Sequence, residues 1–101
     1  MPRFLKKKLG NKKIMQEQHI EALKTILGAV HYYCVRYNQR EISAKDWECI
    51  TSYLHIPKNT KYSLAIDGKE LLLTTDLLVV KYIHHDFRSE RLLHVVHKSK
   101  Q

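Results

Sequence analysis

The residues of this chain whose types and spacing could do chemistry are aromatic and basic. Tyr32, Arg36 and Arg40 follow one another at intervals of four residues, so a helix would place them on one side. An exposed tyrosine ring can stack on a nucleic-acid base, and guanidinium groups one and two turns further along can pair with phosphates. The spacing therefore predicts a nucleic-acid surface. It is equally consistent with Arg36 stacked on Tyr32 in solvent, or with a strand layer that covers both side chains.

The first thirteen residues supply a second group of cations. They carry a charge of +6 and no acidic residue, whereas residues 14–101 carry only +2 of the formal +8. We therefore predict a flexible basic arm over residues 1–13, ahead of one small globular domain over residues 14–101. Such an arm is a solvated terminus, a segment that lies along phosphates, or a nuclear-localisation-like patch. The predicted nucleic-acid-binding residues are Arg3, Lys6, Lys7, Lys8, Lys12, Lys13, Tyr32, Arg36 and Arg40.

Metal-binding and catalytic motifs are weak by comparison. The pairs His84–His85 and His94–x–x–His97 would meet if the last two elements paired, but neither cysteine is near them. Zinc needs three or four ligands with supporting partners. The polar segment 84–90 contains the residue types of a catalytic triad, yet a loop does not preorganise them, and no glycine-rich phosphate loop is present. We predict no metal, no cofactor and no enzymatic activity.

A long amphipathic helix must position the tyrosine and the arginines. Apolar residues recur at spacings of 3 and 4 between Ile20 and Tyr37, which is the pattern of a helix with one buried face. We expect the helix to begin between Ile14 and Glu17 and to end near Asn38. Gly28, in its middle, marks either a close approach by a second surface or a tolerated weakness of roughly 1 kcal/mol. The stripe consists of Ile20, Leu23, Leu27, Val30, Cys34 and Tyr37, with Ile26 and Tyr33 along one edge.

A second helix is expected to follow. Ser43 with Asp46 three residues later is a capping-box pattern, and Pro57 prevents the helix from continuing much past His55. The short connection over residues 39–42 predicts an αα-hairpin with a core between the two helices. The apolar face of the second helix consists of Trp47, Ile50 and Leu54.

Cysteine usage and hydropathy bear on the compartment. Cys34 and Cys49 both fall on predicted helix faces and form no CxxC pair. The basic residues that follow Met1 have no apolar region behind them, so they do not read as a secretory signal, and no apolar run is long enough to span a membrane. We expect two buried thiols in a reducing compartment, an intracellular location (cytoplasmic or nuclear) and no membrane association.

After the second helix the apolar period becomes that of strands. Residues 61–66 alternate, and Asp67–Gly68 ahead of Leu71–Leu73 predicts a type I′ hairpin turn. Residues 77–83 predict a third strand. Residues 92–97 are ambiguous, because their β-branched residues favour a strand and a preceding serine favours a capped helix. The predicted fold class is α+β, with an N-terminal αα-hairpin packed on a small antiparallel β-meander of three or four strands.

The same region has a competing interpretation. Ile50, Leu54 and Ile56, with a turn between them, resemble the core of a helix-turn-helix over about fifteen residues. That resemblance implies a winged helix-turn-helix with a recognition helix over residues 61–66. The sequence departs from the pattern at His55, where glycine is usual, and again where a lysine replaces a buried aliphatic residue. The residues that would face the groove are Lys58, Asn59, Lys61 and Ser63.

Together these features predict a small nucleic-acid-associated accessory or regulatory protein that binds through the basic arm and the aromatic-basic helix face. The alternative is a protein–protein interaction module, a small inhibitor or adaptor that docks by a sheet edge or a helix face. The expected partner is accordingly DNA, RNA or another protein, and a homodimer is left open. Removing residues 1–13 should weaken binding and flatten its salt dependence only in the first case.

Overall fold

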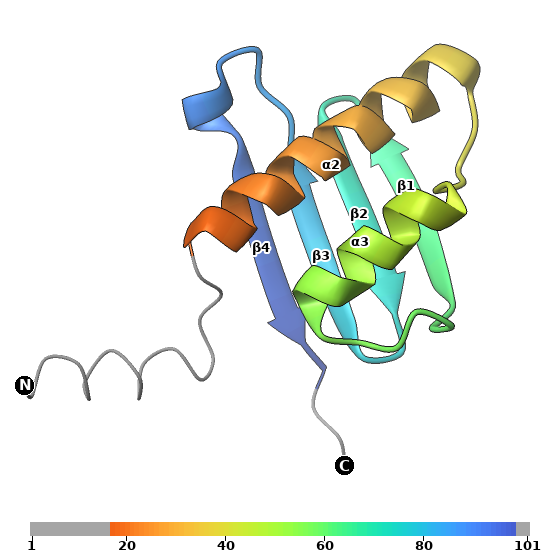
Figure 1. Cartoon of the computed structure of the whole chain (residues 1–101). Coiled ribbons are helices and arrows are strands. Elements are labelled where there is room, and N and C mark those ends of the chain that lie inside the picture. The colour runs from red at the N-terminus through yellow and green to blue at the C-terminus, as the bar shows by residue number, and fades with distance from the viewer. Residues whose placement is uncertain (1–16, 99–101) are drawn as a thin grey trace, which may run out of the picture.

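The computed structural model describes residues 17–98, and in this range two helices cover one face of a four-stranded antiparallel sheet. The strand order is β1-β2-β3-β4, so each strand pairs with its neighbour in sequence. Both helices lie in front of the same sheet face (Figure 1). This is the predicted α+β architecture, and residues 92–97 form its fourth strand. The elements are α2 (Glu17–Tyr37), α3 (Ala44–Leu54), β1 (Tyr62–Asp67), β2 (Glu70–Thr75), β3 (Leu78–Ile83), the short 3-10 helix η1 (Arg88–Glu90) and β4 (Leu92–His97).

The helix α2 is longer than the sheet that it covers. Its 21 residues extend about 31 Å at 1.5 Å per residue, whereas a strand of six residues extends only about 20 Å. α2 crosses the strands diagonally, and its C-terminal turns extend beyond them (Figure 1). The predicted apolar stripe is therefore buried only as far as Cys34. At this end of the helix, Tyr33 beside Cys34 is 47% exposed and Tyr37 is 58% exposed.

The helix α3 is capped and anchored as its sequence predicts. The Ser43 hydroxyl accepts a hydrogen bond from the backbone N–H of Asp46 at 3.1 Å. Trp47 is buried, and its indole Nε1–H donates to the carbonyl oxygen of Lys58 at 2.9 Å. The Trp47 ring also packs against Tyr62 of β1, with ring centroids 4.5 Å apart. These contacts attach α3 to the first strand.

The two cysteines differ in exposure, and both are free thiols. Cys34 is buried in the core, as predicted, and burial raises the pKa of its thiol. Cys49 is exposed, so the prediction of a second buried thiol is wrong. The inward face of α3 passes through Trp47 and Ile50, and a residue between those two positions points away from the sheet.

The helix-facing side of the sheet completes the core. Inward and outward residues alternate along the central strands β2 and β3, and the inward set is buried. The edge strands β1 and β4 are only half-buried on that side. No described element covers the opposite face, where Leu92 is 50% exposed and Val96 is 62% exposed. The buried inward residues are Leu71, Leu73, Thr75, Leu78, Val80 and Tyr82.

The turn between β1 and β2 differs from the prediction by one residue. Asp67 pairs with Glu70, so Gly68 and Lys69 are the two central residues. Gly68 has a φ of 61°, and Asp67 and Lys69 have no positive φ. This is the pattern of a type II′ turn, which takes glycine at its first central position. The predicted type I′ turn, with Asp67 at a central position, is wrong.

The helix-turn-helix interpretation is also wrong. Residues 62–67 form β1, which pairs with β2, instead of a recognition helix. Leu64 lies opposite Leu73 and Ile66 lies opposite Leu71, so the alternating residues add their side chains to the apolar face under the helices. His55 has a φ of 60° and ends α3 as a left-handed cap, as glycine often does.

Candidate nucleic-acid interface

The overhanging end of α2 carries an exposed group of aromatic and basic side chains. We call Tyr32, Tyr33, Arg36 and Tyr37 the tyrosine–arginine surface. The Tyr32 and Tyr33 rings meet edge to face with centroids 5.6 Å apart, and Tyr33 stacks on Tyr37 with centroids 5.8 Å apart and 19° between the ring planes. Tyr32 is 55% exposed. Three tyrosine rings therefore lie next to one another at the protein surface, although large aromatic side chains more often pack toward the interior.

Arg36 stacks on Tyr37, the next residue in the sequence, and not on Tyr32, which precedes it by one helical turn. Its guanidinium carbon lies 5.7 Å from the centroid of the Tyr37 ring, within cation–π range. The contact orients a positive charge beside the ring group without covering Tyr32. A base stacked on Tyr32 would thus find a guanidinium within the next turn of the helix.

Arg40 lies beyond the end of α2, where its side chain folds back on the helix. One Nη1–H donates to the Gln39 carbonyl at 2.8 Å, and it also approaches the Cys34 carbonyl at 3.5 Å. A cation at this position satisfies carbonyl groups that a helix leaves unpaired at its C-terminus. Arg40 remains exposed, but it does not continue the row of Tyr32 and Arg36 as a third helical residue.

Tyr33 and Tyr37 are the residues that reasoning from sequence missed. Their 3.6-residue periodicity places them with the core stripe, and only the overhang of α2 leaves them in solvent. A signal was present in the lengths: an apolar pattern of about 30 Å cannot be covered along its whole length by strands of about 20 Å. The other predicted binding residues, Arg3, Lys6, Lys7, Lys8, Lys12 and Lys13, lie outside the described residues.

A buried polar cluster holds the middle of α2 on the sheet. The Nε2–H of His31 donates to the Gly68 carbonyl at 2.8 Å, because a carbonyl can only accept. The His31 ring stacks on His84, with centroids 5.1 Å apart and 8° between the planes. The Tyr82 hydroxyl lies 2.9 Å from Nδ1 of His84. Gly28 permits this packing, since a Cβ at that position would lie 2.9 Å from the Tyr82 hydroxyl oxygen.

The pKa values of two groups in this cluster, His84 and Tyr82, are shifted toward their neutral forms. Desolvation is the main cause that lowers the pKa of His84, and the charges of Arg91 and His31 lower it further. Desolvation raises the pKa of the buried Tyr82 hydroxyl, against a smaller opposing effect of Arg91. The cluster therefore stabilises the position of α2 through hydrogen bonds and ring stacking.

His85, in the segment between β3 and β4, contacts residues of that same segment. Nδ1 of His85 accepts a hydrogen bond from the backbone N–H of Phe87 at 3.1 Å, and Nε2 lies 3.0 Å from a carboxylate oxygen of Glu90. Because Nδ1 accepts, the proton sits on Nε2 and points at Glu90. Both ring nitrogens are thus occupied, and neither contacts Ser89.

The four histidines that invite a metal do not come together. His84 points under α2, His85 contacts Glu90, and His94 and His97 lie on opposite faces of β4 because they are three residues apart on a strand. Within residues 17–98 no group of three or more His, Cys, Asp or Glu side chains is placed to hold a metal ion.

Comparison with known proteins finds no significant match to this chain. No protein-family model matches the chain, and no curated protein or solved structure is significantly similar to it. In the part of the chain that the structure describes, neither α2 nor α3 is long and apolar enough to cross a membrane.

Proposed function

We propose that the protein binds single-stranded nucleic acid as an accessory or regulatory protein, through the tyrosine–arginine surface and the basic segment 1–13. The observation that carries the proposal is the group of three neighbouring tyrosine rings, each about half exposed, with the guanidinium of Arg36 stacked on one of them, Tyr37. Stacking of a base on an aromatic ring contributes about 1–3 kcal/mol and tolerates any base. DNA and RNA single strands are therefore both expected ligands.

The distribution of charge supports a division of labour between the two elements. Lys and Arg exceed Asp and Glu by six in residues 1–13, whereas the rest of the chain is close to balance. Counterion release should therefore come mainly from the basic segment. The tyrosine–arginine surface adds ring faces and one guanidinium, so it should contribute affinity that depends little on salt.

The test is a titration of fluorescent single-stranded DNA and RNA at several salt concentrations. Tyr32→Ala should weaken binding by roughly 1–3 kcal/mol and leave the slope of log affinity against log salt unchanged. Neutral replacements of Lys6, Lys7, Lys8, Lys12 and Lys13 should reduce the magnitude of that slope by about 0.7 for each phosphate that the variant no longer neutralises. Arg36→Gln should show part of both effects.

Val35→Ala is the matched control for the tyrosine variants. Val35 is 57% exposed on the same turns of α2 but offers no ring, so its replacement should leave both affinity and salt slope unchanged. Binding of neither DNA nor RNA by the parent chain below about 10 μM at low salt would refute the proposal, since non-specific binding alone reaches that range.

The second candidate, a protein–protein interaction module, is favoured by the uncovered face of the sheet. Leu92 and Val96 of β4 are exposed there, next to half-buried outward residues of β2 and β3. A partner that docks on this face would lose affinity in a Val96→Asp variant and be indifferent to the removal of residues 1–13. The nucleic-acid function predicts the reverse pattern for the same two changes.

A further inference from the structure

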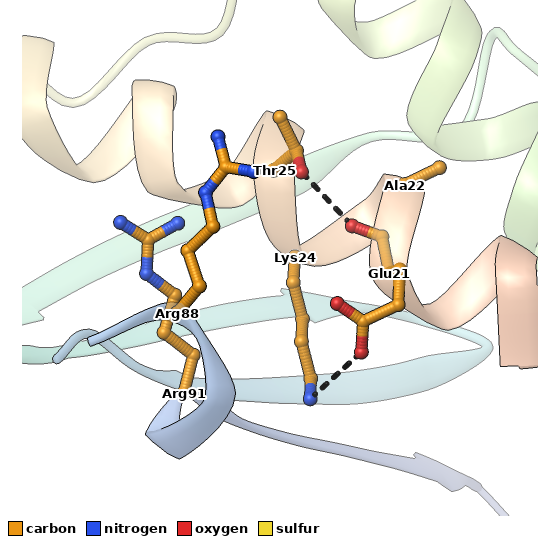
Figure 2. Close-up of a pocket in the computed structure, with 6 residues that line it drawn as sticks. All are labelled: Glu21, Ala22, Lys24, Thr25, Arg88 and Arg91. Atoms are coloured by element: carbon orange, nitrogen blue, oxygen red, sulfur yellow. Dashed lines mark hydrogen bonds and ion pairs between the residues drawn. The ribbon is translucent and has the colours of Figure 1, made fainter.

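A small cavity lies between α2 and the chain around η1, away from the tyrosine–arginine surface. Its volume is about 180 Å³. The cavity is half open to solvent, and its volume is roughly ten times the ~10–15 Å³ that a single water needs, so a phosphate group can enter. Figure 2 shows two arginine side chains that extend side by side toward α2 at this cavity. Its lining residues are Glu21, Ala22, Lys24, Thr25, Arg88 and Arg91.

We propose that this cavity binds a phosphomonoester group. Three cations and one carboxylate line it, which leaves a net charge of +2 at neutral pH. A phosphomonoester carries a charge of about −1.5 to −2 at pH 7, whereas each internal phosphodiester of a strand carries −1. The charge of the cavity therefore matches a terminal or free phosphate better than a phosphate within a chain.

Arg91 is already oriented for such a ligand. Its Nε–H donates to the His85 carbonyl at 3.1 Å, and its Nη1 lies close enough to α2 that a Cβ on Gly28 would be 3.0 Å away. The hydrogen bond from Nε–H holds the guanidinium plane in place. Within residues 17–98 its Nη nitrogens make no hydrogen bond or ion pair, so they remain able to donate to a ligand. A preorganised planar fork is the geometry that binds phosphate through two hydrogen bonds.

Lys24 lines the cavity from the α2 side, with its ammonium turned toward Glu21 and away from the two guanidinium groups (Figure 2). Its side chain is only 17% exposed, and its ammonium lies 3.5 Å from a carboxylate oxygen of Glu21, which is itself 62% exposed. A long and exposed ion pair of this kind is weak, so an incoming dianion can compete with the carboxylate. The Thr25 hydroxyl contributes less, because it donates its hydrogen to the Glu21 carbonyl at 3.0 Å.

Arg88 completes the set from the exposed side. Within residues 17–98 its guanidinium makes no hydrogen bond or ion pair, so binding need not break an existing contact. The nearest acidic residue on the same short helix, Glu90, has its carboxylate 3.0 Å from His85 and is not among the lining residues. Arg88 is thus the cation that can be removed with the least effect on the fold.

The first experiment uses adenosine 5′-monophosphate as the probe and adenosine as its control. NMR spectra of the side-chain Nε–H groups should show shifts of Arg88 and Arg91 with the monophosphate and none with adenosine. Arg88→Gln and Lys24→Gln should each lower the affinity for the monophosphate by about five- to tenfold. This lies between the effect of an exposed ion pair and that of a charge-assisted hydrogen bond. Lys45→Gln, which removes an exposed charge from α3, should change nothing.

The direction in which Glu21→Gln changes the affinity for the monophosphate is the decisive test. It removes the carboxylate that pairs with Lys24, so the affinity for the monophosphate should rise by about two- to fivefold, the size of an exposed ion pair. A nonspecific effect of charge on the whole surface would act equally at Lys45. Absence of the Arg88 and Arg91 shifts, or weaker binding by Glu21→Gln, would overturn the proposal.

A second pair of probes separates a free phosphate from the end of a strand. A 5′-phosphorylated oligonucleotide is compared with its 5′-hydroxyl form. A gain in affinity from the phosphate that disappears in Arg88→Gln assigns the cavity to strand ends. A response to the monophosphate with no gain for the strand assigns it to small phosphorylated molecules. Tyr32→Ala should weaken both oligonucleotides equally and leave adenosine monophosphate unaffected, so this site and the proposed function fail or succeed independently.

Discussion

At the scale of single residues, Gly28 decides how closely α2 can lie on the sheet. An alanine there would place its Cβ 2.9 Å from the Tyr82 hydroxyl oxygen, and the fully buried Tyr82 side chain, bonded to His84, has no room to move. Alanine gains about 1 kcal/mol of helix propensity, whereas overpacking costs about 1–3 kcal/mol. We expect Gly28→Ala to lower the free energy of unfolding by roughly 1 kcal/mol, measured by urea denaturation.

The background Tyr82→Phe provides the control for that change. Without the hydroxyl oxygen only the approach to Arg91 Nη1 at 3.0 Å remains, so Gly28→Ala should cost less in the Tyr82→Phe chain than in the parent. Comparison of all four proteins in one double-mutant cycle isolates the interaction. An equal cost of Gly28→Ala in both backgrounds would show that the hydroxyl is not what opposes the added methyl group.

His84 makes stability depend on pH in a defined direction. Its pKa in the folded chain is lower than the ordinary value of 6.5, mainly because of desolvation. The unfolded chain therefore takes up the proton first as the pH falls, and stability is lost below about pH 6.5. Above that pH the contribution of neutral His84 is complete. Denaturation midpoints at pH 7.5 and 5.5 should differ, with the lower stability at pH 5.5.

His84→Gln tests whether this residue is the cause. Glutamine keeps a hydrogen-bonding group near Tyr82 but does not titrate, so the loss of stability between pH 7.5 and 5.5 should become smaller. The parent and the variant need to be compared over the same interval, since other histidines titrate there as well. If both chains lose the same stability, the pH dependence originates elsewhere.

At the scale of elements, α2 consists of a buried part and an exposed end. Leu27 is fully buried over the strands, whereas Tyr37 is 58% exposed on the overhang. Leu27→Ala should therefore lower the free energy of unfolding by about 2–5 kcal/mol. Tyr37→Ala should change it by less than about 0.5 kcal/mol, as usual for surface positions.

Thermal melting of these two variants provides the measurement. Both residues belong to one helical stripe by their spacing, so a sheet long enough to cover the whole helix would make both changes costly. A large effect at Tyr37 would mean that its ring is packed in the free protein and not available as a binding surface.

At the scale of the whole molecule, the two thiols report separately on surface and core. Cys49 is exposed, whereas Cys34 is fully buried and burial raises the pKa of its thiol. A thiol reagent should therefore label Cys49 in the native protein at once. Cys34 should react only when the domain opens, at a rate reduced by the equilibrium constant for unfolding.

A Cys49→Ser variant makes Cys34 the single reporter, and its labelling rate should rise steeply through the urea transition. The helices and the sheet share one core, so the opening that exposes Cys34 should coincide with loss of the far-UV dichroism. Fast labelling of Cys34 in native buffer would show that α2 separates from the sheet on its own.

Much of the fold can be predicted from the sequence, because the signals are local. The capping of α3 needs only Ser43 and Asp46, three positions apart. The alternation of residues 61–66 predicts β1 without knowledge of its partner. The turn type is not contained in a local signal. Asp67–Gly68 predicts a hairpin, but the register of β1 against β2 decides that Gly68 and Lys69 are its two central residues.

The candidate sites depend on distances between elements, which no local pattern contains. Periodicity places Tyr33 and Tyr37 on the apolar side of α2, yet the sheet ends before it reaches them, and this alone turns them into a surface. Lys24 and Arg91 are far apart in the sequence, and they line one cavity because the β-meander returns β4 to the N-terminal half of α2. The sequence alone determined the apolar periodicity of the segments and the capped start of α3. The finite extent of the sheet and the order of its strands decided which of the apolar faces are covered, because burial is a property of the assembled layers and not of any one segment.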